Sequence, residues 1–131
     1  MADRRQGVLA TVGRDGTPHL SNVHYVCDAE ARILRISTTA GRAKGRNLLR
    51  DGRAVLHVGG PDFFTFAVAE GVVTVAVPTA VGDPVTDELY GVHAVFNGAA
   101  ERPRFDERML RDGRMIVRIA VTRLYGLIPP P

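Results

Sequence analysis

A change of phase inside one long apolar segment constrains the fold of this chain more than any other feature of its sequence. Within residues 63–77 the bulky side chains occupy even positions before Glu70 and odd positions after Gly71. They are Phe64, Phe66 and Val68, and then Val73, Val75 and Val77. Because side chains alternate across a strand, such a change at a glycine predicts a β-bulge or a sharp bend. Bends of this kind form the corners of small barrels.

Five further segments have the composition of strands, and short turns join most of them. The Asp15-Gly16 pair after the first apolar run is typical of a hairpin turn. The expected strands cover residues 7–12, 19–27, 32–38, 53–58, 63–77 and 114–124. Six strands with short connections predict a mostly β protein, a small six-stranded antiparallel barrel.

Helical patterns interrupt these strands. Residues 41–50 have helical composition and end before Gly52, a suitable residue to follow a helix. Asp83 and Pro84 are a suitable N-cap and first residue for a helix that closes at Gly98. A short helix is also expected at about 103–112. The second half of the chain therefore adds one or two accessory helices to the barrel.

The composition predicts a single domain over residues 1–131. The chain has 45% hydrophobic residues and a net charge of +3, which excludes a disordered protein. Its single cysteine, Cys27, excludes an internal disulfide framework. No apolar run reaches the roughly 18 residues needed to cross a bilayer, and the first residues do not resemble a signal peptide. We therefore expect a cytoplasmic protein that does not bind membranes.

The basic residues point to a small anionic partner. The chain has 17 basic residues, and all except Lys44 are arginine. Most are scattered, but one group lies close together in the sequence: Arg42, Lys44, Arg46, Arg50 and Arg53. A cluster of this size suits one anionic ligand better than a nucleic acid groove, so no nucleic acid partner is expected.

Residues 37–47 are the best candidate for such a site, because they join a predicted strand to the basic helical segment. Ser37 and Thr38 supply hydroxyl groups, and Arg42 and Lys44 supply positive charge. Free N–H groups and the dipole at a helix N-terminus favour an anion at the same place. A solvated basic turn explains the composition equally well at this point.

The second predicted strand carries polar side chains on both faces, namely His19, Ser21, Asn22 and His24. Such a strand meets either solvent, or a ligand or a second subunit. His19 and His24 are five positions apart and so lie on opposite faces, which prevents them from binding one metal ion. The sequence has no metal-binding motif, and no metal site is expected.

Phe64 and Phe66 are expected to share a strand face. There they either pack in the core, which is the commoner use of such a pair, or pack against a flat ring.

Several stretches of the chain, in the same order, resemble the pyridoxamine 5′-phosphate oxidase-like superfamily of split β-barrel flavin and deazaflavin oxidoreductases. The resemblance is strongest to the branch that binds the deazaflavin coenzyme F-420. The stretches that carry it are residues 7–12, 15–23, 41–51, 67–71 and 124–126.

The resemblance implies a split β-barrel that forms a homodimer, with cofactor sites in grooves between the subunits. Arg42 and Lys44 match the basic pair that holds the cofactor phosphate, and Ser37 and Thr38 match the strand end beside the polyol chain. The remaining matches line the ring pocket or approach it from the other subunit: His19, Ser21 and Asn22, and then Phe64 and Phe66.

The resulting hypothesis is an F-420-dependent oxidoreductase that transfers a hydride to a conjugated small molecule. The cofactor carries the chemistry, so no catalytic side chain is assigned. Two alternatives remain: an FMN-binding oxidase-like protein on the same fold, and a non-catalytic F-420 carrier. The sequence does not identify the substrate.

Overall fold

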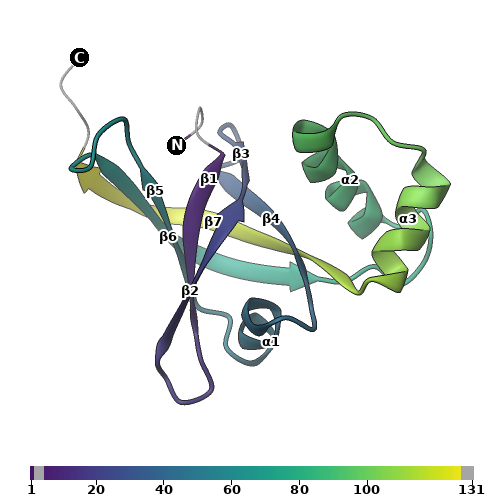
Figure 1. Ribbon diagram of the computed structural model, residues 1–131, viewed down its shortest axis with the longest axis horizontal. Coiled ribbons are helices and arrows are strands. Elements are labelled where there is room, and N and C mark those ends of the chain that lie inside the picture. The colour runs from purple at the N-terminus through teal and green to yellow at the C-terminus, as the bar shows by residue number, and fades with distance from the viewer. Residues whose placement is uncertain (2–4, 128–131) are drawn as a thin grey trace.

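The fold is one curled antiparallel sheet with three helices, seen in a computed structural model that describes Met1 and residues 5–127 (Figure 1). Within these residues the sheet has seven strands in the order β2-β1-β5-β6-β7-β4-β3. The elements are β1 (Gln6–Val12), β2 (Pro18–His24), β3 (Val26–Asp28), β4 (Ile33–Thr39), α1 (Ala43–Arg50), β5 (Ala54–Gly59), β6 (Phe66–Ala76), α2 (Pro84–Asn97), α3 (Arg102–Arg111) and β7 (Arg114–Leu127).

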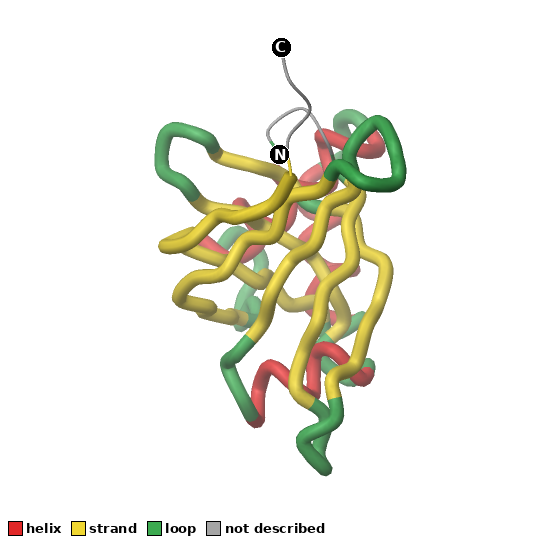
Figure 2. Tube along the Cα trace, turned by 90° about the vertical axis from the view of Figure 1, so that its left-hand side faces the viewer, coloured by secondary structure: helices red, strands yellow, loops and turns green. Residues whose placement is uncertain are grey.

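The sheet is strongly curled (Figure 2), and a core of aliphatic side chains lies inside it. Leu9, Leu34, Leu56, Val117 and Ile119 come from four different strands, and each is almost completely buried. Burial of one such side chain contributes about 1.5–3 kcal/mol to the free energy of unfolding. The expected mostly β split barrel is therefore confirmed.

The β-bulge predicted from the phase change is present in β6. The register between β6 and β7 shifts between Glu70 and Gly71, with Glu70 opposite Arg123 and Gly71 opposite Val121. A Cβ atom at Gly71 would lie 1.9 Å from the carbonyl oxygen of Ala120. The backbone of β7 therefore approaches Gly71 too closely for any side chain.

The chain forms one strand more than expected, because the segment predicted as a single strand over 19–27 is divided at Tyr25. Residues before Tyr25 form β2, which pairs with β1 at one edge of the sheet. Residues after it form β3, which pairs with β4 at the other edge. Tyr25 is fully buried, and its hydroxyl group donates a 2.8 Å hydrogen bond to the carbonyl of Met1. The barrel thus closes through a bend in the chain.

Two strand boundaries also differ from the expected ones. β6 begins at Phe66 and not at residue 63, because Asp62 holds a tight turn. Its Oδ1 accepts hydrogen bonds from the N–H groups of Phe64 and Thr65 at 2.9 and 3.1 Å. β7 continues past residue 124 to Leu127, where it still pairs with Phe66.

The helical hairpin α2–α3 packs against one side of the sheet (Figure 1, right). As predicted, Asp83 caps α2: its Oδ1 accepts a 2.9 Å hydrogen bond from Thr86 N, and Pro84 follows as the first residue. Leu89 and Val92 of α2 form a second apolar cluster with Phe105, Met109 and Ile116.

Glu88 fixes α2 to the sheet through two arginines. Its carboxylate accepts hydrogen bonds from Arg118 of β7, and it accepts a 3.1 Å bond from Arg35 Nε of β4. The bonds from Arg118, together with Arg35 and against the effect of burial, hold the pKa of Glu88 below its usual value of 4.5. This stabilisation is therefore present above about pH 4.5 and is lost as the pH falls below it.

We expect Glu88→Gln to lower the free energy of unfolding by about 1–3 kcal/mol at pH 7, since both guanidinium groups lose a partly buried counterion. The loss should shrink as the pH falls through the lowered pKa of Glu88, because the wild-type carboxyl group then takes up a proton. Urea unfolding at pH 7 and at acidic pH measures this difference. Glu107→Gln, at an exposed position of α3, is the control. A Glu88→Gln loss that is the same at both pH values would contradict the electrostatic explanation.

Candidate functional site

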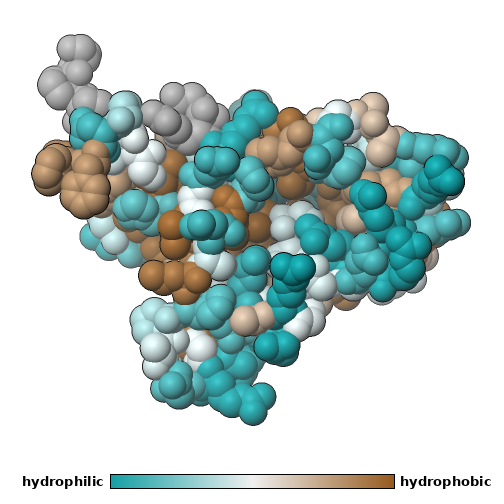
Figure 3. Space-filling model, viewed as in Figure 1, coloured by the Kyte–Doolittle hydropathy of each residue, from teal (hydrophilic) through white to brown (hydrophobic). Residues whose placement is uncertain are grey.

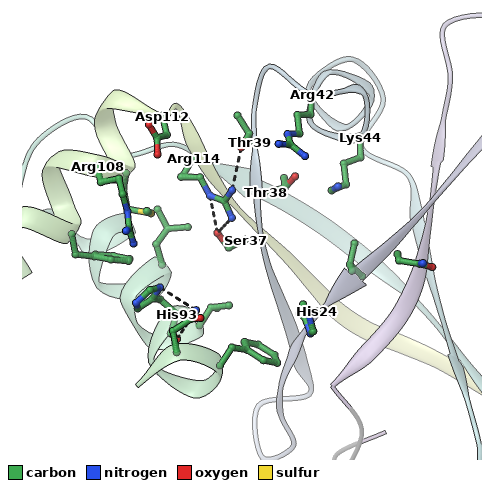
Figure 4. A pocket seen from close by; sticks show the side chains of 18 residues that line it. His24, Ser37, Thr38, Thr39, Arg42, Lys44, His93, Arg108, Asp112 and Arg114 are labelled. Atoms are coloured by element: carbon green, nitrogen blue, oxygen red, sulfur yellow. Dashed lines mark hydrogen bonds between the residues drawn. The ribbon is translucent and has the colours of Figure 1, made fainter. Parts of the chain in front are cut away.

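A cleft of about 850 Å³ lies where the barrel is split (Figure 4). One wall is formed by the end of β2, the end of β4 and the start of α1, and the opposite wall by α2 and α3. The end of β2 is available to the cleft because β2 is an edge strand that pairs only with β1.

One end of the cleft is strongly cationic. Arg42, Lys44, Arg108 and Arg114 line it, and Asp112 is the only acidic residue among the described lining residues. Asp112 pairs with Arg111 at 3.5 Å. The cleft therefore has an excess of positive charge that the protein itself does not neutralise.

Arg114 is the most constrained of these cations. Its Nη2 and Nε donate hydrogen bonds to Ser37 Oγ at 2.8 and 3.2 Å, and its Nη1 donates to Thr39 Oγ1 at 3.1 Å. No carboxylate within the described part of the chain forms an ion pair with it. Burial, followed by the charge of Arg42, lowers the pKa of Arg114. A half-buried guanidinium group without a counterion is a good partner for an anionic ligand.

Lys44 extends from the first turn of α1 into the same space (Figure 4). Burial lowers its pKa, and the charges of Arg42 and Arg114 lower it further. These three cations repel one another in the free protein. A bound anion would remove this repulsion and also accept their hydrogen bonds.

The first turn of α1 adds backbone donors to the cationic end. Its N-cap residue, Arg42, has an extended backbone and makes no side-chain capping bond. Gly45 allows the helix to approach the end of β4, since a Cβ atom there would lie 2.5 Å from the carbonyl oxygen of Thr39. Free N–H groups at a helix start favour an anion.

The other end of the cleft is apolar and aromatic. Leu89, Val92, Phe96, Phe105 and Met109 line it from the helical hairpin. Two histidines lie against this wall. The ring of His24 is 4.7 Å from that of Phe96, and the ring of His93 is 4.9 Å from that of Phe105. The cleft can therefore hold a molecule with an anionic group at one end and a flat apolar ring at the other.

The structure brings together five of the nine residues that the family resemblance assigned to the cofactor site. Ser37, Thr38, Arg42, Lys44 and Asn22 all line the cleft. The other four lie outside its described lining: His19, Ser21, Phe64 and Phe66.

His19 and Ser21 lie on the inward face of β2, opposite Thr11 and Leu9. His24, in contrast, is exposed, which agrees with the expected opposite faces of the two histidines. His19 Nδ1 and Ser21 Oγ are buried and have no hydrogen-bond partner among the residues that the structure describes.

Phe64 and Phe66 do not share a strand face, contrary to expectation. Phe64 precedes β6, is 72% exposed and packs edge-to-face on Phe63. Phe66 lies in β6 and stacks on His57 at 5.5 Å. The turn held by Asp62 removes Phe64 from the strand.

Sequence reasoning missed Arg114, Arg108, His93 and the aromatic wall. Arg114 comes directly after Gly113 and has the same parity as Arg118, so it resembles an ordinary polar residue of β7. Only the pairing of Arg114 with Thr39 in β4 places it beside Ser37. A local pattern does not contain this information.

The fold and the cationic cleft belong to a known class of protein. The family model described as pyridoxamine 5′-phosphate oxidase matches residues 1–127, so this chain is a member of that family.

Individual relatives are more distant. A biliverdin reductase of Mycobacterium tuberculosis that depends on reduced F-420 is 36% identical over 56 residues, which are 43% of this chain and 41% of that protein. The matched segment thus spans less than half of that relative.

Two solved structures align over most of the chain. A conserved hypothetical protein of Mycobacterium tuberculosis has a TM-score of 0.70 and 28% identity over 95% of this chain and 78% of its own. A protein named as an F-420 reductase has a TM-score of 0.69 and 25% identity over 92% of this chain and 89% of its own.

Among the described residues no group of three or more His, Cys, Asp or Glu side chains is placed to hold a metal ion. None of the described helices is long and apolar enough to cross a membrane.

Proposed function

We propose that the protein is an oxidoreductase that binds coenzyme F-420 in the cleft and transfers a hydride to a conjugated small molecule. The single observation that carries this proposal is the set of three uncompensated cations, Arg42, Lys44 and Arg114, at the start of α1. The F-420 reductase and the F-420-dependent biliverdin reductase among the relatives support the choice of cofactor.

The residues of the cleft fit the chemistry of such a cofactor. Arg42, Lys44 and Arg114 would hold its phosphate, with Ser37 and Thr38 beside the polyol chain. Asn22, at the end of β2, would face the ring. When bound, a reduced deazaflavin supplies the hydride. The protein's own part is to neutralise the phosphate, orient the ring and limit access of water.

We also propose a cytoplasmic homodimer. Large apolar side chains are exposed on the sheet, with Leu20 65%, Val72 62% and Leu124 57% accessible. Over the sheet, Figure 3 shows hydrophobic residues between hydrophilic residues, whereas the tip of the β1–β2 hairpin is mostly hydrophilic. Light scattering should give twice the mass of one chain, and a stable monomer that binds cofactor fully would contradict a shared groove.

FMN is the alternative cofactor, because its phosphate would fit the same three cations and the family includes pyridoxamine 5′-phosphate oxidase. Titration of the purified protein with F-420 and with FMN, side by side, distinguishes the two. We expect saturable binding of F-420, read from its fluorescence, at a lower concentration than FMN. Tighter binding of FMN would replace the proposal with the flavin alternative, and binding of neither would overturn it.

Binding alone would also fit a carrier. Oxidation of reduced F-420 by a conjugated acceptor, catalysed by the protein, separates the enzyme from a non-catalytic F-420 carrier. Tight binding without turnover of any acceptor tested would favour the carrier.

A further inference from the structure

Lys44 is the only lysine among the 17 basic side chains of this protein. The other basic side chains are arginines, whose guanidinium groups stay protonated in proteins and do not act as nucleophiles. A lysine amine can lose its proton and then has a lone pair that attacks a carbonyl group. Lys44 therefore brings to the cleft a reactivity that its arginines do not have.

The amine of Lys44 lies among cations and has no partner of its own. The residue belongs to the first turn of α1, is half-buried, and extends into the cationic end of the cleft (Figure 4). Within the described part of the chain its Nζ takes part in no hydrogen bond or salt bridge. The charges of Arg42 and Arg114 act on it. No carboxylate of the described residues therefore holds this amine in its charged form.

The surroundings of Lys44 combine a reactive amine with a site for a phosphate. Burial lowers the pKa of Lys44, and Arg42 and Arg114 lower it further. A larger fraction of this amine is thus uncharged at neutral pH than of an exposed lysine. The guanidinium groups of the same two arginines, and the free N–H groups at the start of α1, are suitable donors to a phosphate.

We propose that Lys44 is an acylation site for acyl phosphates, small anionic molecules in which an acyl group is joined to a phosphate. The phosphate of the donor would bind to Arg42, Arg114 and the start of α1. The acyl group would then lie in the space into which Lys44 extends. A neutral acyl donor lacks the anionic group and gains nothing from these cations.

The reaction is an acyl transfer without oxidation or reduction. The uncharged amine of Lys44 attacks the carbonyl carbon of the donor, and a C–N bond forms. The bond between the acyl carbon and the phosphate oxygen then breaks, and its electron pair leaves with inorganic phosphate. The nitrogen releases its proton to water. Arg42 and Arg114 stabilise the negative charge of the departing phosphate.

Acylation would regulate the cleft, because the amide that forms carries no charge. This consequence rests on the proposed function, in which Lys44 helps to hold the phosphate of F-420. The acylated protein should therefore bind F-420 about tenfold more weakly than the unmodified protein. Bound F-420 should in turn protect Lys44 from acylation.

The first test uses acetyl phosphate as the probe and the protein without cofactor. Mass spectrometry of peptides measures acetylation at Lys44 and at the amino terminus within one sample. Acetyl phosphate should favour Lys44 over the amino terminus about tenfold more than N-acetoxysuccinimide, a neutral acetyl donor, does. Equal preferences with the two donors would overturn the inference.

Inorganic phosphate provides a second measurement on the same protein. It should suppress acetylation of Lys44 by acetyl phosphate, whereas chloride at equal ionic strength should not. Acetylation of Lys44 by the neutral donor should be much less sensitive to phosphate. If phosphate and chloride had the same effect, no phosphate site would assist the reaction, and the inference would be wrong.

The matched control is Lys44→Arg combined with Arg46→Lys. This double variant moves the single lysine two positions along α1, to an exposed position outside the cleft, and leaves the net charge unchanged. The relocated lysine should show no added preference for acetyl phosphate. If it showed the same preference as Lys44, the general charge of α1 would attract the donor, and the assignment to the cleft would fail.

None of these acetylation measurements needs F-420. A protein that shows the preference at Lys44 but does not bind F-420 would contradict the proposed function alone. A protein that binds F-420 but shows no preference would contradict only the acylation site.

Discussion

Replacement of both Arg42 and Lys44 by alanine should weaken the binding of F-420 by about a hundredfold or more. Each charge-assisted contact with a phosphate is worth roughly 1.5–3 kcal/mol, and about 1.4 kcal/mol corresponds to a factor of ten in affinity. Arg114 would remain beside the phosphate, so binding should weaken without being abolished. Fluorescence titration of the double variant measures the loss.

The fold should tolerate this double substitution. Arg42 and Arg114 already lower the pKa of Lys44, so the three cations repel one another in the free protein. Removal of two of them should leave the free energy of unfolding unchanged or slightly higher. Arg14→Ala combined with Arg104→Ala is the control, since both arginines are exposed outside the cleft and the net charge changes equally. Equal affinities of the two double variants would place the phosphate elsewhere.

Gly71→Ala should cost about 3 kcal/mol or more of the free energy of unfolding. The added Cβ would meet the carbonyl oxygen of Ala120 at 1.9 Å and the Cα of Val121 at 3.0 Å. Both atoms are backbone of β7, so the contact is relieved only by separating two paired strands. Urea unfolding measures the change.

Gly91→Ala provides the comparison within the same chain. Gly91 lies on the exposed face of α2, where a Cβ would meet nothing within 4 Å. Alanine is the better helix former by up to about 1 kcal/mol, so this variant should be slightly more stable. If both alanine variants had wild-type stability, the bulge would be free to relax. The close approach of β7 would then not explain why residue 71 is glycine.

The structural elements that are determined by residues close together in the sequence were predictable. The phase change around Gly71 predicted the bulge, because the alternation of side chains must be reset wherever an extra residue enters one strand. Asp83 and Pro84 predicted the start of α2, because a capping carboxylate and a fixed φ act within one turn. The helical composition of residues 41–50 predicted α1 in the same way.

The wall of the cleft that α2 and α3 form, and the position of Arg114, were not predictable from local sequence patterns. Arg114 reaches Ser37 only through the pairing of β7 with β4, and Phe96 and Phe105 reach the cleft only because α2 and α3 fold back over the sheet. The helical spacing of Phe96 was recognised, but spacing alone does not reveal what an apolar face packs against. His93 was missed for the same reason, since it lines the cleft beside Phe105 of a different helix.

The turn that precedes β6 shows a further limit. The alternation that predicted the bulge also suggested that Phe64 and Phe66 share a face, but the carboxylate of Asp62 binds two backbone N–H groups and ends the strand early. Asp and Asn compete with the sheet for such donors. The alternation of side chains along a segment gives no information about this competition, so it did not predict where β6 begins.

The bend at Tyr25 has a consequence for how the sheet opens. In most open sheets the two edge strands come from separate segments, so one edge frays while the other stays paired. Here one continuous segment, Pro18–Asp28, supplies both edges. When β2 separates from β1, the adjoining β3 is held less firmly against β4. Separation of β3 from β4 loosens β2 in the same way. The amides of these two distant edges should therefore exchange hydrogen with a common opening free energy, as one cooperative unit, and that opening widens the entrance to the cleft.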